Sequence, residues 1–210
     1  MHKQLTVPHL PHLAHADFNS LSAVFDSLPV HALNDQPWPE FKTCCSTGFS
    51  IFHTGDMIMV KFYVVDDYFK SSRRTVNGPV HKDNCVEFFI SFSGDAYYNI
   101  EFNCLGHGKV AYGTKRTRRT LLPEAAVEKI QAVTWDTHRG TNFNWEMILT
   151  IPLAVFEFDE CSSISGVRAR GNFYKCGDDL PQPHFLCWNG IENAVPNFHL
   201  QEFFGDIIFA

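Results

Sequence analysis

Hydrophobic and polar residues alternate with a period of two along most of the chain after residue 45. This alternation is typical of β-strands, because successive side chains of a strand point to opposite faces of a sheet. We expect strands at residues 47–53, 57–65, 85–92, 97–104, 109–114, 132–136, 144–152, 167–175, 184–188 and 205–209. Turn residues, such as those at 54–56 and 93–95, separate several of these segments. Many short strands divided by turns predict an all-β sandwich or barrel.

Helical patterns are rare, and we expect short helices only around residues 21–28 and 123–131. The first 45 residues contain prolines at positions 8, 11, 29, 37 and 39 and show no sustained alternation. A length of 210 residues fits one large all-β domain. We therefore expect a single domain over residues 1–210, with residues 1–45 as an N-terminal appendage packed on it.

Polar side chains gather on one face of three expected strands. They are Glu87 in 85–92; Tyr97, Asn99, Glu101 and Asn103 in 97–104; and Arg168, Arg170, Asn172 and Tyr174 in 167–175. An unpaired carboxylate is costly to bury, so Glu87 must be hydrogen-bonded, paired or facing water. Lys61 and Tyr63 share the corresponding phase of 57–65. Two interpretations remain open, an exposed sheet face with salt bridges or a ligand face whose charged, amide and aromatic groups suit a sugar.

Trp188 ends the apolar run 185–188 and precedes a turn at Asn189-Gly190. A tryptophan beside a turn can fill the core or can act as a platform on which a sugar ring stacks. Trp145 alternates with Met147 and Leu149, and we expect it in the core.

Composition and charge exclude several classes of protein. The chain is 45% hydrophobic and 19% charged, which argues against disorder. Its net charge of −6 argues against nucleic-acid binding, which needs a basic face. We expect the one basic cluster, Lys115, Arg116, Arg118 and Arg119, to be a solvated hairpin tip. No stretch reaches a membrane-spanning length, so we expect no membrane partner.

The chain has seven cysteines, so at least one thiol cannot pair within it. Cys85, Cys104 and Cys187 lie in apolar strand-like runs, where a free cysteine behaves as a small hydrophobe. There is no Cys-x-x-Cys motif. The simplest expectation is reduced thiols in a cytoplasmic protein, or an extracytoplasmic one if a leader has been removed.

Motifs for nucleophilic catalysis and for phosphate binding are absent from the sequence. Glu87 and Glu101 would face each other across a hairpin of 85–92 and 97–104, as the acid and base of a glycosidase do. The spacing of His9, His12 and His15 suits either a metal site or a polar terminus. The acids Asp66, Asp67, Asp178 and Asp179 lack the spacing of a calcium loop, so we expect solvated turns there.

Several segments together resemble a known family. They are residues 80–90 (Val-His-Lys-Asp-Asn-Cys-Val-Glu-Phe-Phe-Ile), 98–106 (Tyr-Asn-Ile-Glu-Phe-Asn-Cys-Leu-Gly), 145–152, 166–174, 185–188, 198–199 and 204–209. In this order the series resembles the family-9-like carbohydrate-binding modules of the DOMON-like superfamily, and most of all their stand-alone bacterial subgroup. The resemblance covers roughly residues 46–210.

The resemblance implies an antiparallel β-sandwich of jelly-roll type that binds a mono- or oligosaccharide on one sheet without catalysis. It also implies bound calcium in many members and an association with xylan or glucan degradation. Carried over, Trp188 would stack on the sugar and Glu87 would grip its hydroxyls. His81 falls near the second stacking tryptophan of the family, and Glu101 falls at its arginine, which reverses the charge.

The strand 167–175 would then complete the carbohydrate-binding face. Arg170 and Asn172 fall where the family carries amide side chains, and from that neighbouring strand they would restore the lost cation. Asn103 and Tyr174 share the same polar faces and complete the expected site.

Two alternatives to a sugar-binding module remain. One is a carbohydrate-active enzyme that uses the pair Glu87 and Glu101. The other is a haem-binding or protein-partner module, because DOMON-like sandwiches include haem binders. The candidate axial ligands for a haem are His81, His184, His199, Met57 and Met59.

Overall fold

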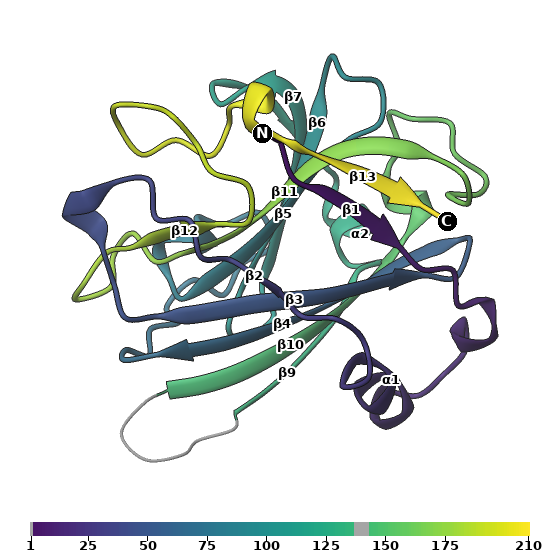
Figure 1. The fold of residues 1–210 in the computed structure, drawn as a ribbon, viewed down its shortest axis with the longest axis horizontal. Helices are drawn as coiled ribbons and strands as arrows, with labels where there is room; N and C mark the ends of the chain where they lie inside the picture. The colour runs from purple at the N-terminus through teal and green to yellow at the C-terminus, as the bar shows by residue number, and fades with distance from the viewer. Residues whose placement is uncertain (1, 137–142) are drawn as a thin grey trace.

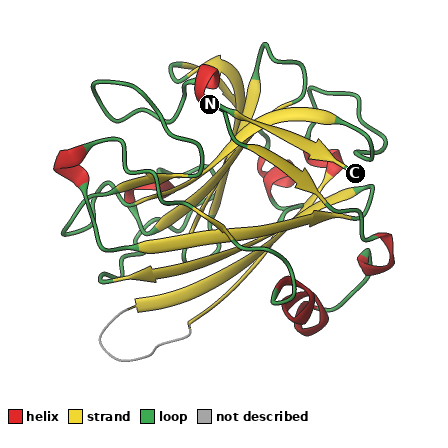
Figure 2. Ribbon diagram, viewed as in Figure 1, coloured by secondary structure: helices red, strands yellow, loops and turns green. Residues whose placement is uncertain are grey.

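Two β-sheets pack face to face in the computed structural model, which describes residues 2–136 and 143–210 (Figures 1 and 2). Within this part of the chain, the larger sheet has the strand order β1-β13-β11-β5-β6-β7-β8, with β12 paired to β11. Its strands are β1 (Gln4–Val7), β5 (Cys85–Ser91), β6 (Tyr97–Asn103), β7 (Gly108–Lys115), β8 (Arg118–Leu121), β11 (Arg168–Cys176), β12 (Phe185–Cys187) and β13 (Gly205–Phe209).

The smaller sheet has the order β2-β3-β4-β10-β9. Its strands are β2 (His31–Ala32), β3 (Ser46–His53), β4 (Met57–Asp66), β9 (Gln131–Asp136) and β10 (Phe143–Pro152). Neighbouring strands pair antiparallel throughout the described chain, except that β1 runs parallel to β13. The predicted antiparallel β-sandwich is therefore confirmed.

The main core lies between the sheets and follows from the period-two pattern. Phe88, Ile100 and Phe173 each point inward from the larger sheet and are fully buried. The ring of Phe173 stacks between Phe49 of β3, at 3.6 Å between centroids, and Phe88 of β5, at 4.6 Å. Buried aromatic side chains of this size each remove a large apolar area from water and dominate the stability of the sandwich.

The helical elements are short. The α-helix α1 (Phe18–Phe25) begins at Asp17, whose carboxylate accepts a hydrogen bond from the Ser20 amide at 2.9 Å and so caps the helix. Its apolar side packs on the outer face of the smaller sheet through Leu21 and Phe25. The second helix, α2 (Glu124–Val127), is one turn long. None of the helices among the described residues is long and apolar enough to cross a membrane.

The N-terminal 45 residues are built into both sheets, which corrects the expectation of an appendage. Strand β1 forms one edge of the larger sheet beside β13, and β2 pairs with β3 of the smaller sheet (Figure 1). Leu5 and Val7 of β1 point into the main core. Four alternating residues are too few to stand out in a proline-rich stretch, so the sequence pattern missed this strand.

The outer face of the larger sheet is also covered. Residues 189–204, which lead from β12 to β13, fold over it, and we call them the cover segment (Figure 1). A second apolar cluster, which includes Trp38, Phe89 and Phe198, fills the space between this segment and the sheet. Strands β5 and β6 are consequently buried on both faces, whereas an antiparallel sheet commonly leaves one face to water.

Candidate functional site

A row of polar side chains crosses the outer face of the larger sheet. The strand register places Tyr174 of β11 opposite Glu87 of β5, Glu87 opposite Glu101 of β6, and Glu101 opposite Lys109 of β7. The predicted hairpin and the facing of Glu87 and Glu101 are both confirmed. Directly opposite residues lie close enough for their side chains to interact, so the row forms one continuous polar surface.

Glu101 is the most strongly held carboxylate of this row. Its side chain is only 2% exposed, and the Lys109 ammonium lies 3.2 Å from Oε1 and 3.3 Å from Oε2. Asn99, two residues away on the same strand, also donates a hydrogen bond to Oε1. His81 Nδ1 lies 3.8 Å from Oε2. Glu101 is therefore an ion-paired acceptor with several donors around it.

Glu87 has a different environment. Burial raises its pKa well above the usual value, and the facing charge of Glu101 raises it further. The Cys176 thiol donates a hydrogen bond to Glu87 Oε1 at 3.1 Å. A glutamate with a raised pKa keeps its proton to a higher pH, so Glu87 can donate a hydrogen bond as well as accept one.

These side chains line a cavity of about 220 Å³ between the sheet and the cover segment. Its walls are formed by His81, Glu87, Glu101, Lys109, Arg116, Arg119, Cys176, Asp178, Phe185, Pro196, Asn197, Phe198 and His199. Pockets for drug-sized ligands span about 300–1,000 Å³, and one liquid water takes about 30 Å³. The size of this cavity suits a ligand much larger than water and smaller than a typical drug.

Arg119 reaches the cavity from the edge strand β8, which the sequence pattern also missed. Its guanidinium lies over the Tyr97 ring, at 4.1 Å from the centroid, and donates to Asn99 Oδ1 at 2.6 Å. It also bonds backbone carbonyls of Tyr97, Ala111 and Gly113. The basic cluster is a hairpin tip, as predicted, and Lys115 and Arg118 are exposed there. Arg119, however, is held in the sheet, because strand pairing turns its side chain back onto β6.

The aromatic wall consists of Phe185 and Phe198. Phe198 stacks on Tyr174 with 4.1 Å between ring centroids. The Trp38 ring contacts both phenylalanines, at 5.8 Å from Phe185 and 6.0 Å from Phe198 between centroids. Tyr174 also donates a hydrogen bond from its hydroxyl to the Phe198 carbonyl at 3.1 Å. These contacts hold the two rings in place at the wall of the cavity.

Trp188 lies on the opposite side of the sheet from this cavity. It is 4% exposed and packs edge-on against Phe49 and Phe173 in the main core. The reason is strand phase: Cys187 pairs with Tyr174, so Phe185 and Cys187 point outward while Leu186 and Trp188 point between the sheets. The same period-two argument, applied to β12, would have selected Phe185.

Two further residues of the predicted sugar face hold the cover segment instead of lining the cavity. Asn172 donates to the Asn189 carbonyl at 2.8 Å, and Arg170 donates to the Phe204 carbonyl at 2.7 Å. The cation beside Glu101 is therefore Lys109 of β7, whereas the sequence predicted Arg170 of β11, which lies on the other side of β6. Asn103 has a comparable structural role, because it donates to Asp83 Oδ2 at 3.0 Å.

His199 and Asp178 line the cavity from loops. Tyr97 Oη lies 2.8 Å from His199 Nδ1, and burial, followed by the positive charges of Arg119 and Arg116, lowers the pKa of His199 to about 3. His199 is thus neutral near pH 7. Burial raises the pKa of Asp178, and His81 and Arg116 partly offset this effect.

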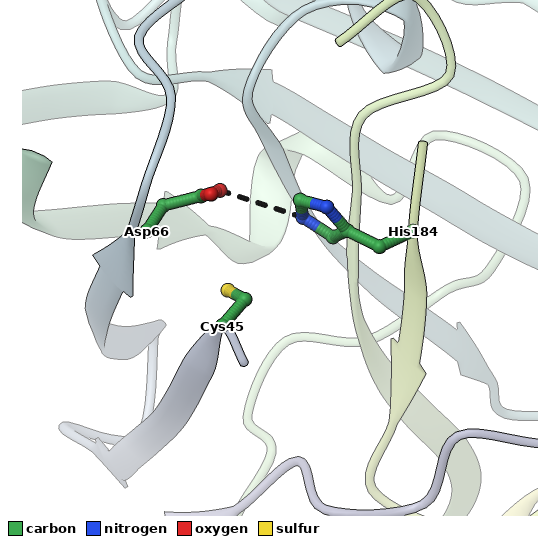
Figure 3. A group of neighbouring side chains, drawn as sticks. All are labelled: Cys45, Asp66 and His184. Atoms are coloured by element: carbon green, nitrogen blue, oxygen red, sulfur yellow. Dashed lines mark ion pairs between the residues drawn. The ribbon is translucent and has the colours of Figure 1, made fainter. Parts of the chain in front are cut away.

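Asp66 is buried, which corrects the expectation of a solvated turn. It lies near Cys45 and His184, 3.4 Å from His184 Nε2 (Figure 3), and Lys175 Nζ lies 3.2 Å from its Oδ2. Burial favours protonation, but His184 and Lys175 outweigh it and lower the pKa of Asp66 below its usual value. Lys175 Nζ is also 2.8 Å from His184 Nε2 and 2.9 Å from the Cys176 carbonyl. An internal ammonium group therefore fills this cluster.

Lys61 belongs to the other sheet, so it does not join the polar face of the larger one. Its ammonium pairs with Asp26 and Glu146, each at 2.9 Å, and lies 4.8 Å from the Tyr63 ring centroid. Lys61 is buried and also donates a hydrogen bond to Ser22 of α1 at 3.1 Å, and this burial explains why its ammonium needs two carboxylate partners.

The candidate haem ligands do not converge. His81 and His199 line the cavity, but His184 is in the Lys175 cluster and Met59 packs under α1. A haem is at least drug-sized, whereas the cavity is about 220 Å³. Of the two interpretations left open for His9, His12 and His15, the metal site gains no support, because these residues are not among the clusters of three ligating side chains found in residues 2–136 and 143–210. His9 instead stacks on His53, with 4.7 Å between ring centroids.

Calcium does not fit the metal-ligating groups that the structure brings together. In the described residues, the clusters of three are Cys45–Asp66–His184 and Cys85–Glu87–Cys176. Both contain cysteine, whereas calcium takes oxygen ligands. All seven cysteines are unpaired, and Cys85, Cys104 and Cys187 are buried as predicted.

A β-sandwich with a polar, aromatic-walled cavity on one sheet has the general form of a small-ligand-binding module. The family described as carbohydrate-binding family 9 matches residues 19–209, so the chain belongs to this family. The match covers nearly the whole sequence.

Solved structures agree with this assignment. A provisionally assigned carbohydrate-binding protein from Bacteroides uniformis ATCC 8492 is 30% identical, with a TM-score of 0.93 and 100% of each chain covered. A family 9 carbohydrate-binding module from Caldicellulosiruptor kristjanssonii in complex with glucose is 12% identical, with a TM-score of 0.64 over 99% of this chain and 96% of that one. The same organism's family 9 module in complex with cellotriose is 11% identical, with a TM-score of 0.62 over 99% and 93%. These two share the fold. No curated protein matches the sequence.

Proposed function

We propose that this protein binds a mono- or short oligosaccharide, without converting it, in the cavity between the larger sheet and the cover segment. The observation that carries the proposal is the Glu101–Lys109 ion pair facing a phenylalanine wall in one cavity of about 220 Å³. Membership of carbohydrate-binding family 9 supports the ligand class. The glucose and cellotriose complexes of structural neighbours suggest the first ligands to test.

The groups in the cavity match the two surfaces of a sugar. Glu101 accepts hydrogen bonds from hydroxyls, Lys109 donates to them, and Glu87 with its raised pKa can do either. Asn197 adds an amide to the lining of the cavity. The C–H face of the sugar ring would pack on Phe185 or Phe198, since aromatic rings provide large apolar contact surfaces.

Few hydrogen bonds and two phenylalanine rings predict weak binding, with a dissociation constant near ~1 mM, about −4 kcal/mol. Isothermal titration calorimetry against a panel that begins with glucose and cellotriose measures this directly. We expect Lys109→Met and Phe185→Ala each to weaken binding at least tenfold. The matched control is Lys129→Met, an exposed lysine outside the cavity, which should bind as the parent protein does. Equal affinity in all four proteins would contradict the proposed site.

A second candidate function is glycoside hydrolysis, because two facing carboxylates with different surroundings can act as acid and base. Glu87 would be the acid and Glu101 the base. This alternative predicts hydrolysis of aryl glycosides or polysaccharides that is lost in Glu87→Gln. Sugar binding with no turnover over a broad substrate panel would exclude it and leave the binding function.

A further inference from the structure

A group of soft metal ligands lies at the wall of the same cavity. Cys85 and Cys176 are directly opposite each other on β5 and β11, and Glu87 is two residues beyond Cys85 on the same face of β5. The sulfur atoms and one carboxylate oxygen all lie within 4.8 Å of one another. We propose that Cys85, Glu87 and Cys176 form a binding site for one zinc ion, or for another thiophilic divalent ion. This inference goes beyond the proposed sugar binding and does not depend on it.

The geometry suits tetrahedral coordination. With Zn–S bonds of ~2.3 Å and Zn–O bonds of ~2.1 Å, tetrahedral ligands lie about 3.5–3.8 Å apart. Here the Cys176 sulfur is 3.1 Å from Glu87 Oε1, and all three atoms fall within 4.8 Å, so small side-chain adjustments suffice. All three ligands sit on paired strands of the sheet, which fixes their backbone positions.

The chemistry of the ligands selects the ion. Two thiols and one carboxylate favour zinc over calcium or magnesium, which prefer oxygen ligands. A zinc ion with two thiolates and one carboxylate carries a net charge of −1. The basic groups Lys109, Arg116 and Arg119 line the same cavity and offset this charge.

The site can be reached, and a fourth coordination position is open. Glu87 and Cys176 both line the cavity, so an ion can enter from it, and water or a ligand can occupy the remaining position. Three protein ligands that include cysteine, with a fourth position open to water or a ligand, are a known arrangement for zinc. The other cluster, Cys45–Asp66–His184, is already filled by the Lys175 ammonium and therefore carries no such proposal (Figure 3).

Cobalt(II) titration of reduced, metal-free protein tests the site, because thiolate ligation gives a charge-transfer absorption band. We expect the band to saturate at one ion per chain and to disappear when zinc is added. Cys85→Ala and Cys176→Ala should each weaken binding at least ~100-fold, and the conservative Glu87→Gln at least ~10-fold. Circular dichroism of each metal-free variant shows whether it is folded, and Glu87→Gln provides the test should a cysteine variant not fold.

The chain offers matched controls. Cys187→Ala removes a buried thiol from the same outer cluster but outside the trio, and it should bind as the parent does. Cys45→Ala should also leave binding unchanged. Absence of the band in the reduced parent protein, or loss of the band in Cys45→Ala while Cys85→Ala and Cys176→Ala keep it, would overturn the proposal. Sugar affinity measured in chelator separates failure of this site from failure of the sugar site.

Discussion

The ion pair between Glu101 and Lys109 gives the sharpest test of the site's energetics. Glu101 is almost completely buried, whereas the Lys109 side chain is 22% exposed. We consider Lys109→Met, Glu101→Gln and the double variant. Methionine keeps much of the lysine stem and removes the charge, while glutamine keeps the shape of glutamate and can still accept the hydrogen bond from Asn99.

The magnitude follows from the distances. At 3.2 Å and an effective dielectric constant of ~20, the attraction is about 5 kcal/mol before the cost of desolvation. Removing one partner of a buried pair costs about 3–5 kcal/mol. Because Lys109 reaches solvent and Asn99 and His81 still face Glu101, we expect about 2–3 kcal/mol for Lys109→Met. For Glu101→Gln we expect about 1–2 kcal/mol.

Urea unfolding measures these changes as shifts in the midpoint at constant slope. The double variant should be more stable than the sum of the single changes predicts, by about 1–2 kcal/mol of coupling. Lys129→Met removes an exposed pair with Glu157 and should change stability by less than ~0.5 kcal/mol. Additive single changes would refute the idea that Lys109 neutralises Glu101.

Three further predictions follow from other contacts. Trp188→Ala should lower stability by about 3–5 kcal/mol in thermal or urea unfolding, since it opens a cavity in the main core; a stable variant that loses only sugar affinity would contradict this. Tyr174→Phe should cost about 1 kcal/mol and speed amide hydrogen exchange in the cover segment, because it loses the bond to the Phe198 carbonyl. The folded-state pKa of His199 lies below its unfolded value of ~6.5, so the folded state favours the neutral side chain. The contribution of His199 to the free energy of unfolding is therefore fully present above pH ~6.5. This contribution should fall by about 1.4 kcal/mol per pH unit as the pH drops from ~6.5 towards 3. The difference between the urea unfolding midpoints at pH 7 and pH 5 should therefore be smaller in His199→Gln than in the parent protein.

The period-two pattern of the sequence was sufficient to predict the β-sandwich and the pair of carboxylates at the centre of the site. It located β5 and β6 to within a residue or two, and it placed Glu87 opposite Glu101 because a hairpin fixes the register of its two strands. These features depend on local alternation and a short turn, both of which a single sequence displays.

The remaining parts of the site depend on contacts between distant segments. The cover segment meets the larger sheet through polar residues such as Asn172 and Tyr174, and a polar strand face alone does not distinguish a ligand from a covering loop. Arg119 enters the site because β8 pairs with β7, although β8 has no apolar alternation. Trp188 could have been placed correctly by phase, because its neighbours Phe185 and Cys187 face the other way.

A crystal structure of the protein with glucose or cellotriose, whichever binds more tightly, tests the proposed binding site most directly. We expect a sugar ring against Phe185 or Phe198, with its hydroxyls bonded to Glu101 and Lys109 beneath the cover segment. A sugar bound on another surface, with this cavity free of sugar, would contradict the proposed binding site.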